Sequence, residues 1–222
     1  DHRDLHSFPT RRSSDLDAEA KYFLQESAKA AEMVADKYKD QLMVNTGTIP
    51  QKEGDPQNPY FNIWGTTDMS GTPEVILWRK YSKELGVVNN VEVGVQHGDF
   101  GVGLTRSMVE GYVMKDGKPI YNSAYTYSDQ TIADVATNRD PRLTIFLKVP
   151  GQKNVFKNMS ASEDHYVIDE PYPTITTRNA ENDYSTGYAI RKGGTFDKAN
   201  TGNGNCYNAA EIFRATEALL NY

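Results

Sequence analysis

A single long helical pattern stands near the start of a chain that is otherwise interrupted by turn-forming residues. Between residues 17 and 42, apolar residues such as Leu24, Ala28 and Ala31 recur at steps of three and four, which is the period of a helix. The small alanines on this face suit close packing against other helices. Residues 45–73 are rich in Gly, Pro, Asn and Thr and read as loop.

Shorter elements are expected in the middle of the chain. Residues 74–81 predict a short buried strand or a helical turn, and residues 86–103 a glycine-rich loop with weak alternation. Residues 104–115 predict a short helix capped by Thr105, followed by a turn at Asp116 and Gly117.

The second half predicts a helical turn near residue 132, a break at Pro141 and a strand from Leu143 to Val149. Residues 151–207 read mostly as loop. Asn208 with Glu211 three residues on resembles a capping box, which predicts a helix over the last residues. The whole pattern predicts helices at both ends around a long, irregular, aromatic-bearing middle.

Residues 1–16 read as the translation of a widely used sequencing adapter. One reading frame of that adapter gives the same sixteen residues as Asp1 to Leu16. Segments of this kind are excluded from fold reasoning. The arginines and the two histidines of this segment are therefore assigned no function, and we expect the segment to contribute nothing to the fold.

Composition narrows the classes of function. The net charge of −6 argues against a nucleic-acid partner. The single cysteine, Cys206, forms no internal disulfide and no cysteine zinc site. Fourteen tyrosines and two tryptophans supply aromatic faces with polar groups, which occur in cores, protein interfaces and sugar-stacking surfaces.

The sequence offers no positive sign of catalysis. His97 and His165 lie far apart and in no metal-binding frame. The segment that ends at Glu211 resembles a calcium loop, but its third ligand position falls on Gly202 or Ala199, which carry no side-chain oxygen. No nucleophile elbow, dinucleotide or phosphate-loop motif occurs. We expect no metal, no cofactor and no enzymatic activity.

Four stretches, in order, resemble the SusD/RagB family of outer-membrane nutrient-binding lipoproteins of Bacteroidota. They are "GLTRSMVEGYVMKDGKPI", "NRDPRLTIFL", "STGYAIRKG" and "EIFRATEALLNY". In the last, Phe213 and Thr216 depart from the usual wording of the family. The physical role expected for "NRDPRL" is structural, with Arg139, Asp140 and Arg142 pairing across a chain reversal set by Pro141. Arg191 and Lys192 are likewise expected to anchor a loop.

The resemblance implies a mostly α fold with minor β, in which tetratricopeptide-type helices support an irregular, loop-rich second half. It implies that residues 17–222 are a partial SusD/RagB-like domain, truncated at both ends. It further implies a lipid-anchored, surface-exposed outer-membrane protein that captures oligosaccharides or other nutrients, in some members peptides. Such a protein passes them to a SusC-type TonB-dependent transporter. The alternative is a helical-repeat interaction module without a small ligand.

Ligand-binding residues vary within such a family, so they are predicted from this sequence alone. Tyr60 and Trp64 lie in the loop-like segment "NPYFNIWGTT", and loops carry binding residues. His97, Asp99 and Phe100 in "VQHGDFGVG" form a second candidate group. We expect a solvent-facing aromatic platform that includes Trp64, whereas the other tryptophan, Trp78, is expected in the core.

Overall fold

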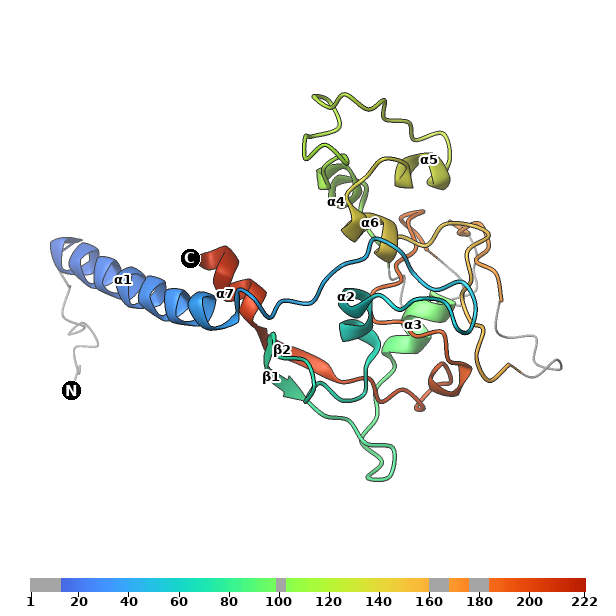
Figure 1. Cartoon of the computed structure of the whole chain (residues 1–222), viewed down its shortest axis with the longest axis horizontal. Helices are drawn as coiled ribbons and strands as arrows, with labels where there is room; N and C mark the ends of the chain where they lie inside the picture. The colour runs from blue at the N-terminus through green and yellow to red at the C-terminus, as the bar shows by residue number, and fades with distance from the viewer. Residues whose placement is uncertain (1–12, 99–102, 160–167, 176–183) are drawn as a thin grey trace, which may run out of the picture. The chain divides into compact units, whose positions relative to one another are not determined.

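The computed structural model describes residues 13–98, 103–159, 168–175 and 184–222. Helices make up 34% of the chain and accompany one two-stranded sheet, so the predicted mostly α fold with minor β is confirmed. The elements labelled in Figure 1, with two short 3₁₀ helices, are α1 (Ser13–Tyr38), α2 (Pro59–Asn62), η1 (Ile63–Gly65), β1 (Val75–Arg79), α3 (Val91–His97), α4 (Arg106–Gly111), α5 (Ile132–Ala136), α6 (Pro141–Phe146), η3 (Lys198–Asn200), β2 (Ala210–Arg214) and α7 (Ala215–Asn221).

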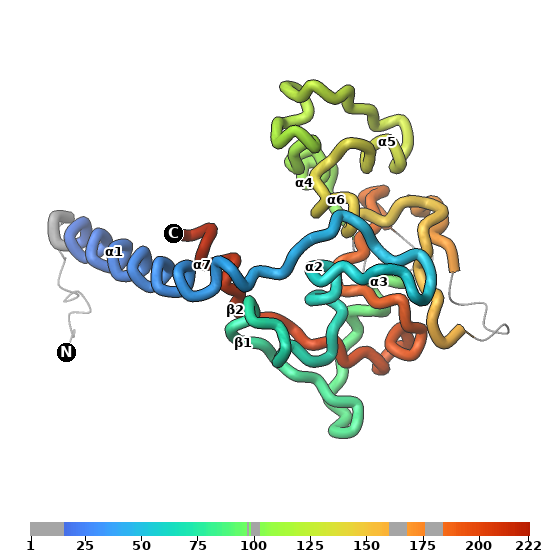
Figure 2. Tube along the Cα trace, viewed as in Figure 1, coloured from blue at the N-terminus to red at the C-terminus, as the bar shows by residue number. Residues whose placement is uncertain are grey.

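The described residues form two compact units. The first consists of residues 13–42, 73–77 and 213–222, and the second of the described residues within 43–72 and 78–212. Figure 2 follows the chain of the second unit, where long irregular segments connect short helices. This unit matches the irregular, aromatic-bearing middle that the sequence predicts.

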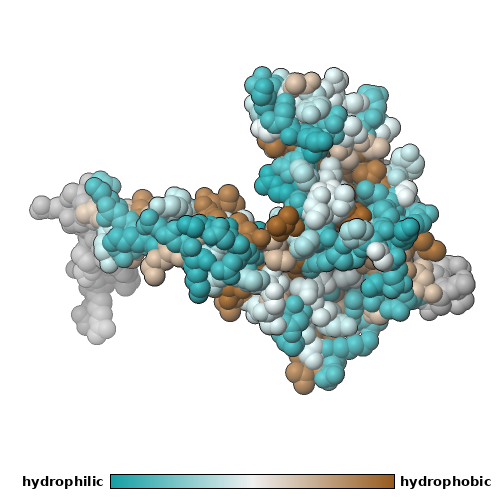
Figure 3. Space-filling model, in the orientation of Figure 1, coloured by the Kyte–Doolittle hydropathy of each residue, from teal (hydrophilic) through white to brown (hydrophobic). Residues whose placement is uncertain are grey.

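In the first unit, the predicted long helix is confirmed as α1. It begins at Ser13, so the last four residues of the adapter-like segment are helical. The short helix α7 packs beside it (Figure 1), and the Tyr222 hydroxyl donates a hydrogen bond of 2.8 Å to Glu32 Oε1. Ala31 is buried, whereas Leu24 and Met33 are exposed. Figure 3 shows hydrophobic residues on the surface of the first unit.

The prediction for the last segment was wrong in part. Asn208 caps no helix, because its side-chain amide donates to Glu92 Oε1 and to the Gly193 carbonyl. The chain instead continues as β2, which pairs with β1, and α7 begins only at Ala215. Branched and aromatic residues in "EIFR" and "VILWR" favour this strand pairing.

Two other segments differ from the sequence prediction. Residues 91–97, predicted as loop, form α3, which ends at Gly98 in the left-handed conformation with φ 76°. The predicted strand from Leu143 is the helix α6, in which Asp140 is the N-cap and Pro141 the first residue. An acidic cap followed by proline is a helix-start signal, and here it outweighed the strand propensity of the residues that follow.

Helix α6 contributes to both hydrophobic clusters of the second unit. Ile145 and Phe146 join the aromatic cluster, and Leu143, with Leu147 just after the helix, joins the aliphatic cluster. The aromatic cluster is completed by Phe61, Trp64 and Phe196, and the aliphatic cluster by Leu104, Val109 and Val135. The central position of α6 gives the "NRDPRL" segment a structural role.

Arg139 and Arg142 support this helix in different ways. The buried Arg139 guanidinium donates a hydrogen bond of 2.8 Å to the Tyr112 carbonyl and another to the Val109 carbonyl. Arg142 donates hydrogen bonds from two guanidinium nitrogens to the Asp140 carboxylate. This hydrogen bonding lowers the pKa of Asp140. The expected pairing is therefore confirmed for Asp140 and Arg142, whereas Arg139 binds backbone carbonyls instead.

A buried carboxyl on α3 predicts a pH dependence of stability. Burial raises the pKa of Glu92 from 4.5 to about 7, so the folded state binds this proton more tightly than the unfolded state. The stability from this group is complete below pH 4.5 and is lost as pH rises to about 7. This pKa shift of Glu92 corresponds to a change in the free energy of unfolding on the order of 3 kcal/mol.

Glu92→Gln is expected to remove this dependence. As pH rises from 4.5 to 7.5, the wild type should lose stability relative to the variant. Urea denaturation measures this as a growing difference in the free energy of unfolding between the two proteins. Burial lowers the pKa of the nearby Lys148 to about 8, so its own transition lies at higher pH. A difference that is constant over this range would contradict the assignment.

Candidate functional site

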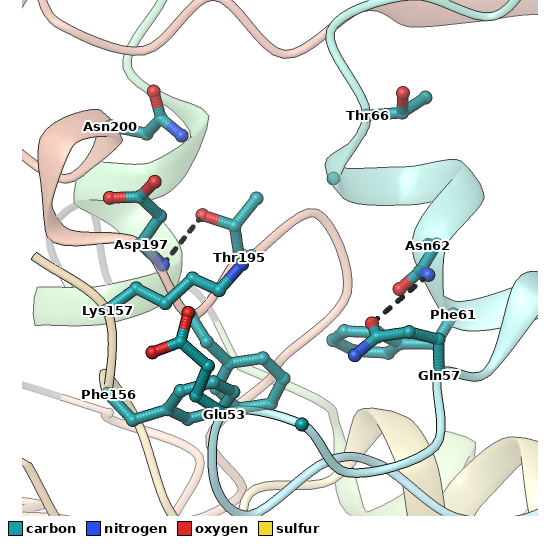
Figure 4. Close-up of a pocket in the computed structure, with 14 residues that line it drawn as sticks. Glu53, Gln57, Phe61, Asn62, Thr66, Phe156, Lys157, Thr195, Asp197 and Asn200 are labelled. Atoms are coloured by element: carbon teal, nitrogen blue, oxygen red, sulfur yellow. Dashed lines mark hydrogen bonds between the residues drawn. The ribbon is translucent and has the colours of Figure 1, made fainter.

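A pocket of about 400 Å³ opens in the second unit between two walls that are distant in sequence. One wall comes from α2, η1 and the residues next to them, and the other from residues 156–157 and 194–200. Figure 4 shows Gln57, Asn62 and Thr66 on one side, and Lys157, Asp197 and Asn200 on the other. The volume lies within the range of small-ligand sites, about 300–1,000 Å³.

The apolar part of this pocket is a set of three phenylalanines. Phe156 stacks on Phe196 with ring centroids 4.6 Å apart, and Phe61 lies 5.8 Å from Phe196. Phe61 and Phe196 belong to the aromatic cluster and are buried, whereas Phe156 is only half buried. The core therefore holds these rings in place, and Phe156 offers the more accessible face.

Each wall is held by local hydrogen bonds, and the two walls approach each other closely at one end. The Asn62 amide donates to Gln57 Oε1 at 3.4 Å, and Asp197 Oδ1 accepts from the Ala199 backbone N–H and the Asn158 amide, both at 2.9 Å. A Cβ placed on Gly65 would lie 2.8 Å from the Gly194 carbonyl oxygen. A side chain at position 65 would therefore force the walls apart.

The rim is rich in groups that bind hydroxyls. Glu53, Gln57 and Asn62 are exposed on one side, and Lys157 on the other. Asn200 is buried, and its Oδ1 has no hydrogen-bond partner among the described residues. Planar amides and carboxylates beside aromatic faces are the combination that recognises polar ligands with apolar faces, such as sugars.

The first pair of predicted binding residues belongs to the elements of one pocket wall, but neither residue is among the described residues that line the pocket. Tyr60 and Trp64 lie on α2 and η1, not in a loop, and Trp64 is only 8% exposed. The prediction of a solvent-facing Trp64 was therefore wrong. Its ring packs edge-on against Tyr60 and Phe146, both with centroids 6.1 Å away, and Lys192 Nζ lies 3.7 Å from the ring centroid.

The second predicted group is only partly described. His97 is the last residue of α3, and its side chain is not described. Asp99 and Phe100 lie outside the described residues. Trp64 does border a smaller pocket with Tyr81, Asn89 and Lys192, but neither Tyr60 nor Trp64 is among the described residues that line the main pocket.

Arg191 has the anchoring role that the sequence predicts. Its buried guanidinium donates a hydrogen bond of 2.8 Å to the Lys153 carbonyl and lies 3.2 Å from Glu170 Oε1. Lys148 Nζ approaches the same oxygen at 3.3 Å. One buried carboxylate thus faces two buried cations, and this network ties three distant segments of the second unit together.

Two features typical of other protein classes are absent from the described part of the chain. No group of three or more His, Cys, Asp or Glu side chains there is placed to hold a metal ion. No helix there is both long and apolar enough to cross a bilayer.

A mostly helical fold with an open, polar and aromatic pocket is typical of a ligand-binding protein. The SusD family model matches residues 73–222, and the chain belongs to this family. No match was found among curated proteins. Members of the family are binding proteins rather than enzymes, and they act in nutrient and glycan binding at the cell surface. They are generally lipoproteins associated with the outer membrane.

Proposed function

We propose that this protein captures oligosaccharides at the cell surface and delivers them to a SusC-type TonB-dependent transporter. It is held at the outer membrane by a lipid anchor, and it acts without a cofactor or catalytic step. The main pocket, with its phenylalanine floor and amide-rich rim, is the ligand site. The juxtaposition of Phe156 with Gln57, Asn62 and Asn200 is the observation that carries this proposal.

The chemistry of the pocket supports a saccharide over other ligands. The C–H faces of a sugar ring pack on phenyl rings, while its hydroxyls donate to amide and carboxylate oxygens and accept from amide N–H groups. The rim carries both acidic and basic groups, Glu53 and Asp197 against Lys157. This mixture favours a neutral polar ligand over a strongly charged one, and peptides remain the second candidate class.

The organisation of the chain favours a ligand-binding protein over a helical-repeat interaction module. A repeat module consists of tandem helix pairs. Among the described residues, long stretches of the second unit are instead irregular, and they build the pocket.

The pocket is tested by removing its exposed amides. The double variant Gln57→Ala and Asn62→Ala is expected to lower the affinity for an oligosaccharide roughly tenfold, because two hydrogen-bonding groups are lost. Calorimetry with hexasaccharides of glucose, xylose and mannose on the whole chain measures the effect. Both side chains are exposed, so the melting temperature should stay unchanged.

Gln130→Ala serves as the control, because Gln130 is equally exposed and is not among the pocket residues. It should leave affinity unchanged. If the double variant binds every saccharide as tightly as the wild type does, the ligand site lies elsewhere.

A further inference from the structure

The connection between α4 and α5 displays tyrosines to solvent. In this segment, residues 116–127, called here the tyrosine loop, contain Tyr121, Tyr125 and Tyr127. Tyr121 is 87% exposed and Tyr125 is 38% exposed. Figure 1 shows the connection as a wide loop projecting beyond these two helices.

The loop is organised by one carboxylate. Asp116 Oδ2 accepts hydrogen bonds of 3.0 Å from both the Ala124 backbone N–H and the Ser123 hydroxyl, and Oδ1 accepts from the Lys118 N–H. Ser123 Oγ accepts in turn from the Tyr125 N–H. The hydrogen bond from Ala124 is the largest cause of the lowered pKa of Asp116. Tyr121 and Tyr125 therefore lie on a preformed turn.

The base of the loop is fixed to the core. The Lys115 N–H donates to the Asn138 carbonyl at 2.8 Å, and the Asp140 N–H donates to the Val113 carbonyl at 3.0 Å. These bonds join the loop to the segment that begins α6. The Arg139 guanidinium also lies 5.3 Å from the Tyr127 ring centroid. The loop is thus held at its base by the same residues that support α6.

The tyrosines surround a shallow hollow of about 470 Å³. Its lining consists of the three tyrosines, two hydroxyl residues and two aliphatic residues, and it carries no charge. Tyrosine supplies a large, rigid contact face at low entropic cost, together with a hydroxyl. Aromatic faces surrounded by hydroxyls, without any charge, suit a neutral sugar and disfavour an ionic ligand.

We propose that the tyrosine loop is a second saccharide-binding platform, which holds a neutral glycan chain outside the main pocket. It takes its ligand class from the proposed function, but among the described residues it shares no lining residue with the main pocket. A protein partner fits less well, because a stable protein interface needs about 20–30 residues on each side, whereas a stretch of eight residues forms this hollow. Once a long polymer is bound at one site, its effective concentration at the second site is high. Two sites on one chain therefore raise the affinity for the polymer.

The test compares long and short ligands on the whole chain. The double variant Tyr121→Ala and Tyr125→Ala is expected to weaken retention in gels containing starch, xylan or mannan roughly tenfold. Its affinity for the hexasaccharides, which the main pocket binds, should stay unchanged. Asp116→Asn, which loses one acceptor of the turn, should give a smaller loss in the same gels. Tyr172→Ala is the control, since Tyr172 is 75% exposed but outside the loop.

The outcomes separate the two sites. Loss of polymer retention in the loop variant, with weaker hexasaccharide binding only in the Gln57 and Asn62 variant, supports both sites. An intact polymer affinity in the loop variant overturns the platform, even where the pocket variant is impaired, and leaves a protein contact as the use of these tyrosines. A wild-type chain that binds none of these polymers also overturns the platform. If the loop variant loses polymer retention while the Gln57 and Asn62 variant binds every ligand normally, the platform is supported and the main site lies elsewhere.

Discussion

Trp64→Ala is expected to lower the free energy of unfolding by about 3–5 kcal/mol, as truncation of a core tryptophan does. The indole is buried between Tyr60 and Phe146, with the Lys192 ammonium over its ring. Removing it opens a cavity in the aromatic cluster and exposes Phe146. Urea denaturation followed by circular dichroism measures the change.

The same variant separates packing from ligand binding. Trp64 does not line the main pocket, so hexasaccharide affinity of the folded protein should change little. The exposed Tyr172→Ala serves as the stability control and should stay within about 0.5 kcal/mol of wild type. If the Trp64→Ala protein instead kept normal stability and lost saccharide binding, the result would support the sequence prediction of an exposed aromatic platform at Trp64.

Glu170→Gln is expected to have an effect of similar size. Glu170 is the carboxylate that faces both Lys148 and Arg191, and all three side chains are almost fully buried. The amide keeps the shape but removes the charge, which leaves two cations in a low-dielectric environment. Breaking a buried ion pair in this way lowers the free energy of unfolding by about 3–5 kcal/mol.

Lys148→Met is the informative comparison. It removes the surplus cation and leaves Glu170 paired with Arg191, so the expected change is on the order of 1 kcal/mol or less. Urea denaturation of both variants at pH 7 measures the asymmetry. Equal losses in the two variants would show that packing, rather than charge balance, determines the stability of this region.

The pH dependence of the wild type gives a second measurement of this network. Burial lowers the pKa of Lys148 from 10.5 to about 8. Because the folded pKa is depressed, stability from this group is present above pH 10.5 and is lost as pH falls through about 8. Lys148→Met should abolish this gain of stability between pH 8 and pH 10.5.

Features encoded by a few neighbouring residues were predictable from the sequence. Thr105 caps α4 through its hydroxyl, and Gly117 forms the predicted turn with φ 76°. The long period of α1 and the mostly α class follow from the same local rules. The predictions were wrong where distant contacts decide the structure. In α3, for example, Glu92 and Gln96 are buried because Asn208 and the Thr195 carbonyl bind them.

The main pocket was missed for a related reason. Its lining joins Gln57 and Asn62 to Phe156, Asp197 and Asn200, and nothing local in either segment indicates that they meet. An aromatic residue in a Gly/Pro/Asn-rich stretch suggested exposure for Trp64, but the contact with Phe146 buries it. The repeated Asn and Gly of residues 200–205 are the local signal of an irregular wall, although they fail the register of a calcium loop.

Helix α6 is buried by both hydrophobic clusters, and we expect this to determine the order in which parts of the second unit open. We expect the amides of its buried residues, such as Ile145, to become accessible to solvent deuterium only after both clusters have separated, so that their exchange reports the largest cooperative opening of that unit. The tyrosine loop, held mostly by exposed hydrogen bonds, exchanges through small local openings. Within "DGKPIYNSAYTYSDQTIADVATNRDPRL", we therefore expect amides near the first end to exchange much faster than the buried amides near the second.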